Sequence, residues 1–123
     1  MSKKKFETTR KPPTKKEVEE FELLFPLLES LLFEVKALSQ KKQDGVLNAM
    51  KVKMINKIFK RIKELLKNES TDEFIELLDE ESLPSNSDAL FMIVQFKSAM
   101  ELFKQKYYGE SNFEYSWETT YEK

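Results

Sequence analysis

The chain contains no cysteine and no histidine among its 123 residues. Without cysteine there is no disulfide and no thiolate zinc site, a composition that fits a reducing compartment. Without histidine the commonest general base and the commonest ligand of transition metals are missing. No apolar run reaches the roughly 18 residues that a membrane-spanning helix needs, and no apolar segment of a secretory signal follows the basic start. We therefore expect a cytoplasmic protein with no metal or cofactor and no membrane contact.

Glycine and proline are also scarce, with two and four residues. No glycine-rich loop is present to hold phosphates, which excludes the P-loop and the dinucleotide-binding fingerprint. Nucleophilic triads and di-iron carboxylate bundles require histidine or cysteine, so they are excluded too. Acidic clusters on solvated helix faces do not meet the criteria for a site of acid–base catalysis. The sequence predicts a protein that is not an enzyme and that has no small-molecule substrate.

Hydrophobic residues make up 40% of the chain and charged residues 35%. With so few turn-forming residues this composition favours long helices, and a chain of this length forms one domain. The net charge of −1 results from segments of opposite charge that cancel. Residues 17–38 carry six acidic residues and one basic residue, and residues 39–69 carry nine basic and three acidic residues. Antiparallel helices would pair such faces, so the overall charge alone does not indicate a nucleic-acid partner.

The segment from Val46 to Leu66 has the clearest helical pattern. At about 100° per residue its large apolar side chains fall on one arc, which predicts a helix with one face in the core. Four lysines fall on the opposite side: Lys53, Lys57, Lys60 and Lys67. This lysine face predicts either pairing with an acidic neighbour in the fold or contacts with the phosphates of a nucleic acid.

Two polar residues, Asn48 and Lys51, interrupt the apolar arc of this helix. A lysine on a core-facing position must extend its ammonium to water or find a carboxylate, and the candidates are Glu34 and Asp88. One interpretation is a lysine whose aliphatic stem packs while its charged end reaches solvent. The other is a polar site in the core, formed by Asn48, Lys51 and Asp88, that holds a ligand or a partner.

The preceding helix is predicted over residues 15–39. Thr14 and Glu17 have the spacing of a capping box, and an apolar stripe continues through the whole segment. Pro26 lies inside this stripe, where it removes one backbone donor. We therefore expect a kink near Glu22 or a break into two helices.

Two further helices are predicted toward the C-terminus. The first is short, over residues 71–81, with Ser70 and Glu73 as its capping box and an acidic face that would meet the lysine face. The second runs over residues 88–108, and Gly109 is expected to end it in a left-handed conformation.

Some large apolar residues lie outside the predicted core stripes. They are Leu23 and Phe33 in the first helix and Leu90, Phe91 and Val94 in the last. Each has an explanation in packing, but together they exceed what one four-helix core needs. Such a surplus indicates a surface for a partner protein or for a second copy of the chain.

The tail after Gly109 has aromatic residues at odd positions: Phe113, Tyr115, Trp117 and Tyr121. Strict alternation with polar residues over the first three predicts an extended segment with one aromatic face. A strand needs a neighbour, and no other stretch resembles one. The tail therefore either packs across the helices or inserts into a partner.

The predicted fold class is all-α, a small antiparallel bundle of about four helices of which the third is short. Residues 1–13 are expected to form a flexible basic arm, residues 14–109 the helical domain, and residues 110–123 an acidic and aromatic tail. The predicted function is a non-enzymatic protein–protein interaction module, an adaptor, regulator or subunit that binds a partner or itself. The alternative is a nucleic-acid-binding accessory protein that uses the basic arm and the lysine face.

Overall fold

The computed structural model describes residues 11–111 and 114–120 of the chain. The described part is mostly helical, with three α-helices: α2 (Lys15–Lys41), α3 (Ala49–Leu65) and α4 (Asn86–Tyr107). A short 3-10 helix, η1 (Ser70–Phe74), follows α3, and two strands, β1 (Tyr108–Ser111) and β2 (Glu114–Trp117), follow α4. Within these residues no helix combines the length and the apolar character needed to span a membrane.

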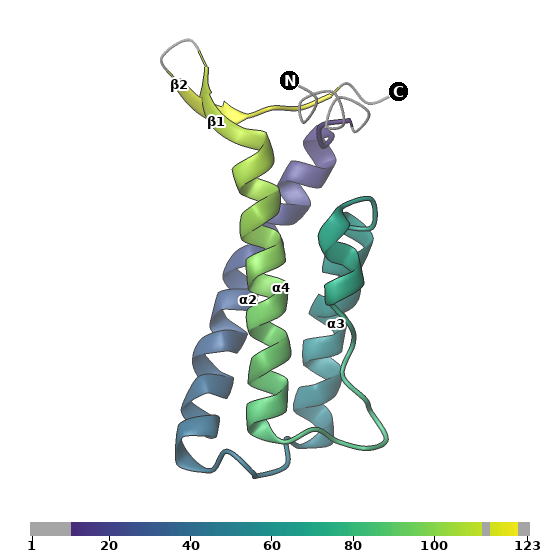
Figure 1. Ribbon diagram of the computed structural model, residues 1–123, viewed down its shortest axis with the longest axis vertical. Coiled ribbons are helices and arrows are strands. Elements are labelled where there is room, and N and C mark those ends of the chain that lie inside the picture. The colour runs from purple at the N-terminus through teal and green to yellow at the C-terminus, as the bar shows by residue number, and fades with distance from the viewer. Residues whose placement is uncertain (1–10, 112–113, 121–123) are drawn as a thin grey trace.

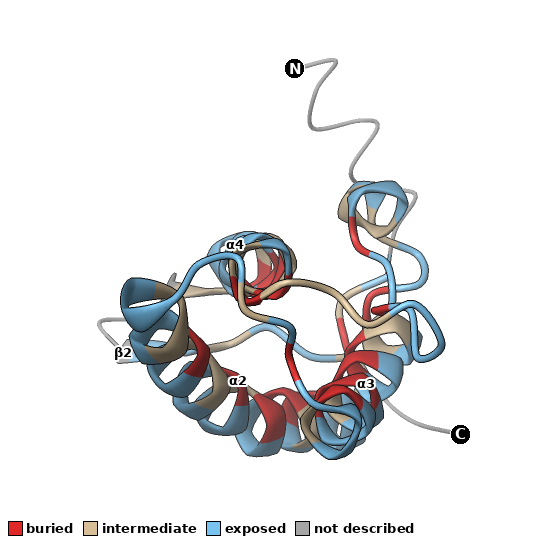
Figure 2. Ribbon diagram, turned by 90° about the horizontal axis from the view of Figure 1, so that it is seen from below, coloured by how far each residue is buried: buried red, intermediate tan, exposed pale blue. Residues whose placement is uncertain are grey.

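The chain runs alternately down and up the long axis of the molecule (Figure 1). α2 descends, α3 ascends beside it, residues 70–84 descend, and α4 ascends against α2. Seen from the end, α2 and α3 form one layer, while α4 and the segment around η1 form the other, with the buried residues turned inward (Figure 2). The core is therefore enclosed on four sides, and α-helices form three of them.

α2 begins at the predicted capping box. The N–H of Glu17 donates to Thr14 Oγ1, and the N–H of Thr14 donates to Glu17 Oε1. The helix continues through Pro26, so the expected break into two helices does not occur. Pro26 and Glu22 are both exposed, and water can therefore solvate the Glu22 carbonyl that has lost its helical donor.

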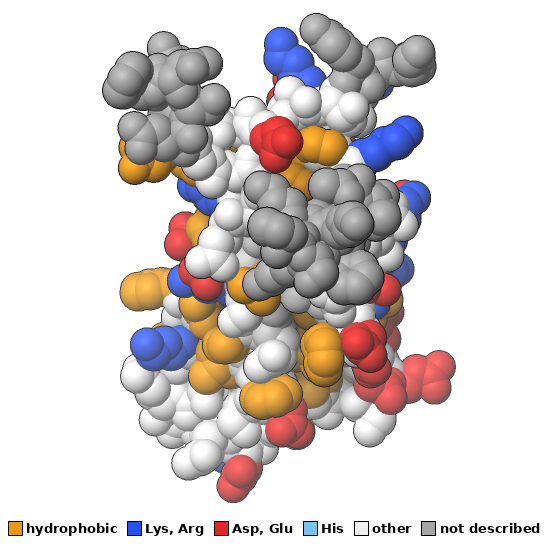
Figure 3. Space-filling view, turned by 45° about the horizontal axis from the view of Figure 1, so that its top comes forward, with side chains coloured by type: hydrophobic (Ala, Val, Ile, Leu, Met, Phe, Trp, Pro, Cys, Tyr) orange, Lys and Arg blue, Asp and Glu red, His pale blue; other side chains and the backbone are white. Residues whose placement is uncertain are grey.

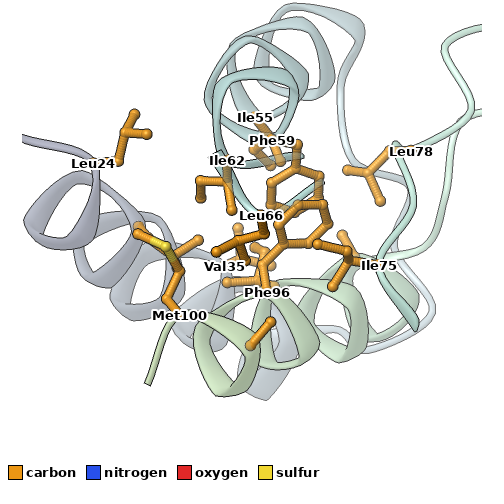
Figure 4. Packing of buried hydrophobic residues seen from close by; sticks show 14 of the residues in the cluster. Leu24, Val35, Ile55, Phe59, Ile62, Leu66, Ile75, Leu78, Phe96 and Met100 are labelled. Carbon is orange, nitrogen blue, oxygen red and sulfur yellow. The ribbon is translucent and has the colours of Figure 1, made fainter. Parts of the chain in front are cut away.

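The centre of the core is an aromatic pair between α3 and α4. The rings of Phe59 and Phe96 are stacked with their centroids 3.6 Å apart, and both residues are fully buried. Ile75 and Leu78, from the segment after η1, lie on one side of this pair (Figure 4). The core thus extends from the helices to a part of the chain that is not helical.

The predicted helix over residues 71–81 is not formed, and the count of four helices is not confirmed. Only residues 70–74 are helical, as one 3-10 turn, and no side chain caps that turn, so the predicted capping box of Ser70 and Glu73 is absent. Residues 75–79 have no helical or strand assignment. This segment still fills the place of the third helix between α3 and α4.

Two side chains of α3 explain why this segment is not helical. Asn56 Oδ1 accepts the N–H of Leu78 at 2.8 Å, and Asn56 Nδ2 donates to the carbonyl of Leu78 at 2.9 Å. Lys63 Nζ donates to the carbonyl of Ile75 at 2.7 Å. Because α3 binds these backbone groups, they are not available for the hydrogen bonds of a helix. Asn56 lies outside the predicted apolar arc of this helix, so the helical pattern of the sequence did not indicate this contact.

α4 passes directly into a β-hairpin. β1 pairs with β2 in antiparallel register, with Tyr108 opposite Trp117 and Gly109 opposite Ser116. The extended segment predicted for the tail is confirmed over β2. Its neighbour β1 begins at Tyr108, the C-cap residue of α4, and continues into the predicted tail. Gly109, expected to end the helix, is a residue of β1.

Candidate functional site

The outer side of α4 carries apolar side chains that are exposed among the described residues. Phe91 is 63% exposed, Val94 40% and Leu102 52%. Together with the exposed Ser98 they are spaced by three, four and four residues, so they form one stripe along the helix. The stripe spans about 17 Å at 1.5 Å per residue. Leu90 is half-buried at its edge.

Phe33 of α2 belongs to the same side of the molecule. An ion pair of 3.9 Å between Glu29 and Lys97 fixes the level of α2 relative to α4. One turn further along these antiparallel helices, Phe33 comes level with Val94, and Phe33 is 79% exposed. We name the α4 face by five residues, of which the first four were predicted to bind a partner: Phe33, Leu90, Phe91, Val94 and Leu102. Hydrophobic side chains gather on the side of the molecule that α4 forms (Figure 3).

A second exposed apolar surface lies on the opposite layer, between α2 and α3. Its members are Leu23 (47% exposed) and Leu27 (43%) on α2, and Met50 (70%) and Met54 (52%) on α3. We call these four residues the α2–α3 face. Of its members, only Leu23 was predicted to lie off the core stripes, and Met54 fell in the predicted apolar arc of its helix.

Two ion pairs frame the α2–α3 face. Arg61 donates from Nε and Nη2 to Glu20 at 2.8 and 2.7 Å, and the carboxylate raises the pKa of Arg61 through these hydrogen bonds and its charge. Toward the other end of the helices, Lys51 Nζ lies 3.0 Å from Glu34 Oε2. Since α2 and α3 are antiparallel, Leu27, midway between Glu20 and Glu34, is level with Asn56 and therefore about 3 Å along the axis from Met54.

The three residues of the predicted polar core site do not form one. Asn48 is exposed and caps α3, accepting the N–H of Lys51 at 2.8 Å. Lys51 reaches Glu34, one of its two predicted carboxylates, at the partly exposed edge of the helix. Asp88 lies exposed in the first turn of α4, and in the described residues no hydrogen bond or ion pair joins it to Asn48 or Lys51.

The lysine face is exposed and only partly neutralised. Lys67 Nζ lies 2.7 Å from Glu64 Oε2, which raises the pKa of Lys67. Lys53, Lys57 and Lys60 are exposed, and no ion pair links them to any residue that the structure describes. The acidic segment after α3 therefore forms no ion pair with these three lysines, and pairing within the fold, one of the two predicted alternatives, is not seen for them in the described residues.

A shallow hollow of about 500 Å³ borders the lysine face. Its charged lining consists of Lys60, Lys63, Lys67, Glu64, Asp72 and Glu76. Lys63 is held 3.2 Å from Asp72 Oδ1. Because carboxylates stand among the ammonium groups, the hollow does not have the uniform positive charge that would favour a bound phosphate.

In the tail, Trp117 packs on the helices. Its ring lies 4.9 Å from that of Phe21 and 5.5 Å from that of Tyr108, and its Nε1 donates to Glu22 Oε2 at 3.1 Å. Tyr115 is 69% exposed. Phe113 and Tyr121, which were also predicted to bind a partner, lie outside the described residues. Trp117 thus holds the hairpin against the ends of α2 and α4.

Replacing Trp117 by alanine is expected to lower the free energy of unfolding by about 2 kcal/mol, because the indole covers Phe21 and forms several aromatic contacts. Urea denaturation followed by circular dichroism measures this loss. Tyr115→Ala in the same strand is the matched control and should change stability by less than about 0.5 kcal/mol. Equal effects of the two substitutions would contradict the docking of Trp117.

The described residues contain no group of three or more acidic, histidine or cysteine side chains placed to hold a metal ion. The pKa of Asp79 is lowered by the backbone N–H groups of Ser82 and Glu81, which it accepts at 2.9 and 2.8 Å in a turn. This carboxylate closes the turn after the extended segment. In comparisons with known proteins, no family model, no curated protein and no solved structure matches this chain.

Proposed function

We propose that this protein is a non-enzymatic protein–protein interaction module and that the α4 face binds its partner. The observation that carries the proposal is the stripe of Phe91, Val94 and Leu102, extended by Phe33 of the adjacent helix. Leaving two phenylalanines 63% and 79% exposed forgoes the free energy of their burial. A partner that covers the stripe recovers this free energy.

The spacing of the stripe also defines the kind of contact. Side chains at helical intervals on one face are the pattern that an amphipathic helix presents to a hydrophobic groove. Phe33 and Phe91 are the proposed anchors, since a few buried residues dominate binding and phenylalanine is enriched in interface cores. Lys97 lies within 4 Å of both Glu29 and Glu101, at 3.9 and 3.8 Å, and supplies a polar edge.

A photo-crosslinking amino acid at position 91 tests the proposal in cells that express the chain. We expect a defined crosslinked product from this position and none from the matched position 82, an exposed serine in the loop before α4. In an extract, excess unlabelled protein should suppress the product, whereas excess protein with Val94→Asp and Leu102→Asp should not. Identical products from both positions, or equal suppression by both competitors, would contradict a partner site on the α4 face.

A second candidate function, an accessory protein that binds nucleic acid, is favoured by the lysines of α3 that no residue in the described ranges neutralises. Three phosphate contacts by Lys53, Lys57 and Lys60 predict a loss of roughly tenfold or more in affinity between 50 and 200 mM salt. Fluorescence anisotropy with a 20-nucleotide single strand and with a 20-base-pair duplex measures this dependence. Changing all three lysines to glutamate should abolish binding. Binding that survives the triple change would refute a role for this face.

A further inference from the structure

The α2–α3 face has an apolar centre that is open to solvent and built from both helices. Leu23 and Leu27 project from α2, and Met50 and Met54 from α3. Methionine side chains are flexible and adapt to a second surface. Half-buried residues of both helices, Leu31 and Ile58 among them, continue this surface toward the core.

The two helices that form this face carry opposite charges. Between residues 17 and 38, in α2, there are six acidic residues and one basic residue, whereas α3 has six basic residues and one acidic residue. Within one molecule, two ion pairs between α2 and α3 use part of this charge. Glu19 on α2 and Lys53, Lys57 and Lys60 on α3 have no ion-pair partner among the described residues. The unused charges therefore remain complementary.

We infer that the α2–α3 face binds a second copy of this chain. A two-fold axis parallel to the helices and centred on the face places α2 of each copy over α3 of the other. The acidic helix then meets the basic helix twice, and Glu19 of one copy approaches the lysine row of the other. Levels along the axis are unchanged by this rotation, so Leu27 of each copy lies near the level of Met54 of the other.

Charge complementarity distinguishes this surface from the α4 face. Beside the α4 face, Lys97 already lies between Glu29 and Glu101 of its own molecule, so these charges are neutralised without a second copy. The α2–α3 face has an apolar centre surrounded by charges that match under two-fold symmetry, as self-complementary interfaces require. The dimer does not depend on the proposed partner site, because none of the four residues of the α2–α3 face belongs to the α4 face.

Sedimentation velocity on the full chain tests the inference between 1 and 200 µM. We expect a species of twice the 14.6 kDa chain mass at the upper end of this range, with a dissociation constant that rises at 0.5 M NaCl. Met54→Glu should weaken dimerisation at least tenfold. Leu102→Glu is the matched control, since both side chains are 52% exposed, and it should leave the dimer unchanged.

Far-UV circular dichroism shows whether each variant is folded, and Leu27→Glu replaces Met54→Glu if the latter unfolds. A wild-type chain that stays monomeric over the whole concentration range would overturn the inference. A dimer that is broken by Leu102→Glu and kept by Met54→Glu would overturn it as well, and would place self-association on the α4 face. The photo-crosslinking experiment separately tests the partner site, so the two proposals fail independently.

Discussion

Replacing Phe96 by alanine is expected to lower the free energy of unfolding by about 4 kcal/mol. Phe96 is fully buried, and its ring lies on that of Phe59 with 3.6 Å between centroids. The substitution removes buried apolar surface and leaves a cavity between α3 and α4, where few other backbone contacts join these two helices. Both effects act in the same direction, because a close-packed core relaxes only partly around a void.

Urea denaturation followed by circular dichroism measures this loss. Phe91→Ala is the matched control on the same helix, since it makes the same chemical change at a side chain that is 63% exposed, and it should alter stability by less than about 0.5 kcal/mol. With Phe59→Ala added, the combined loss should be smaller than the sum of the single losses, because each substitution already removes the stacked pair. A loss below about 1 kcal/mol for Phe96→Ala would contradict the central position of the ring.

Replacing Asn56 by leucine is expected to cost about 3 kcal/mol, although leucine is more hydrophobic and similar in size. The side-chain amide of Asn56 satisfies both the N–H and the carbonyl of Leu78, and its Nδ2 also donates to Glu80 Oε2 at 2.9 Å. Leucine leaves two buried backbone groups without partners, and each costs about 1–3 kcal/mol. The segment of residues 75–79 loses its attachment to α3 as a result.

Two measurements separate this mechanism from a general loss of packing. Amide hydrogen exchange of Leu78 should be slow in the wild-type protein and at least tenfold faster in Asn56→Leu. Lys57→Leu, the neighbouring exposed position on α3, is the control and should leave the exchange of Leu78 unchanged. A protein with Asn56→Leu that matches the wild type in stability and exchange would show that the amide does not hold the segment.

The start of α2 was predictable because its determinants are local. Thr14 and Glu17 form the capping box within one turn, and the apolar stripe behind them needs no distant partner. The stretch over residues 71–81 was not predictable in the same way. Ile75 and Leu78 are three residues apart, a spacing that suits a buried helix face as well as an extended segment crossing a core. The side chains of Asn56 and Lys63, more than ten residues earlier, decide between the two.

The two candidate surfaces also differ in whether local sequence patterns predict them. Phe33, Phe91 and Val94 were candidates for a partner surface because each departs from the apolar stripe of its own helix, and all three are exposed in the structure. The α2–α3 face depends on how two helices pair. Met54 belongs to the apolar arc of α3, but α2 covers only the adjacent part of that arc and leaves Met54 exposed. The pattern of a single helix does not reveal how the two helices pair.

Trp117 is the only tryptophan of the chain, and it lies at the end of the molecule where the hairpin meets Phe21 and Phe103. Its fluorescence therefore reports the environment of that end, whereas far-UV circular dichroism reports the three helices as a whole. Followed together during heating, the two signals distinguish release of the hairpin from melting of the helices. The protein thus carries its own optical probe for local opening, with no label added.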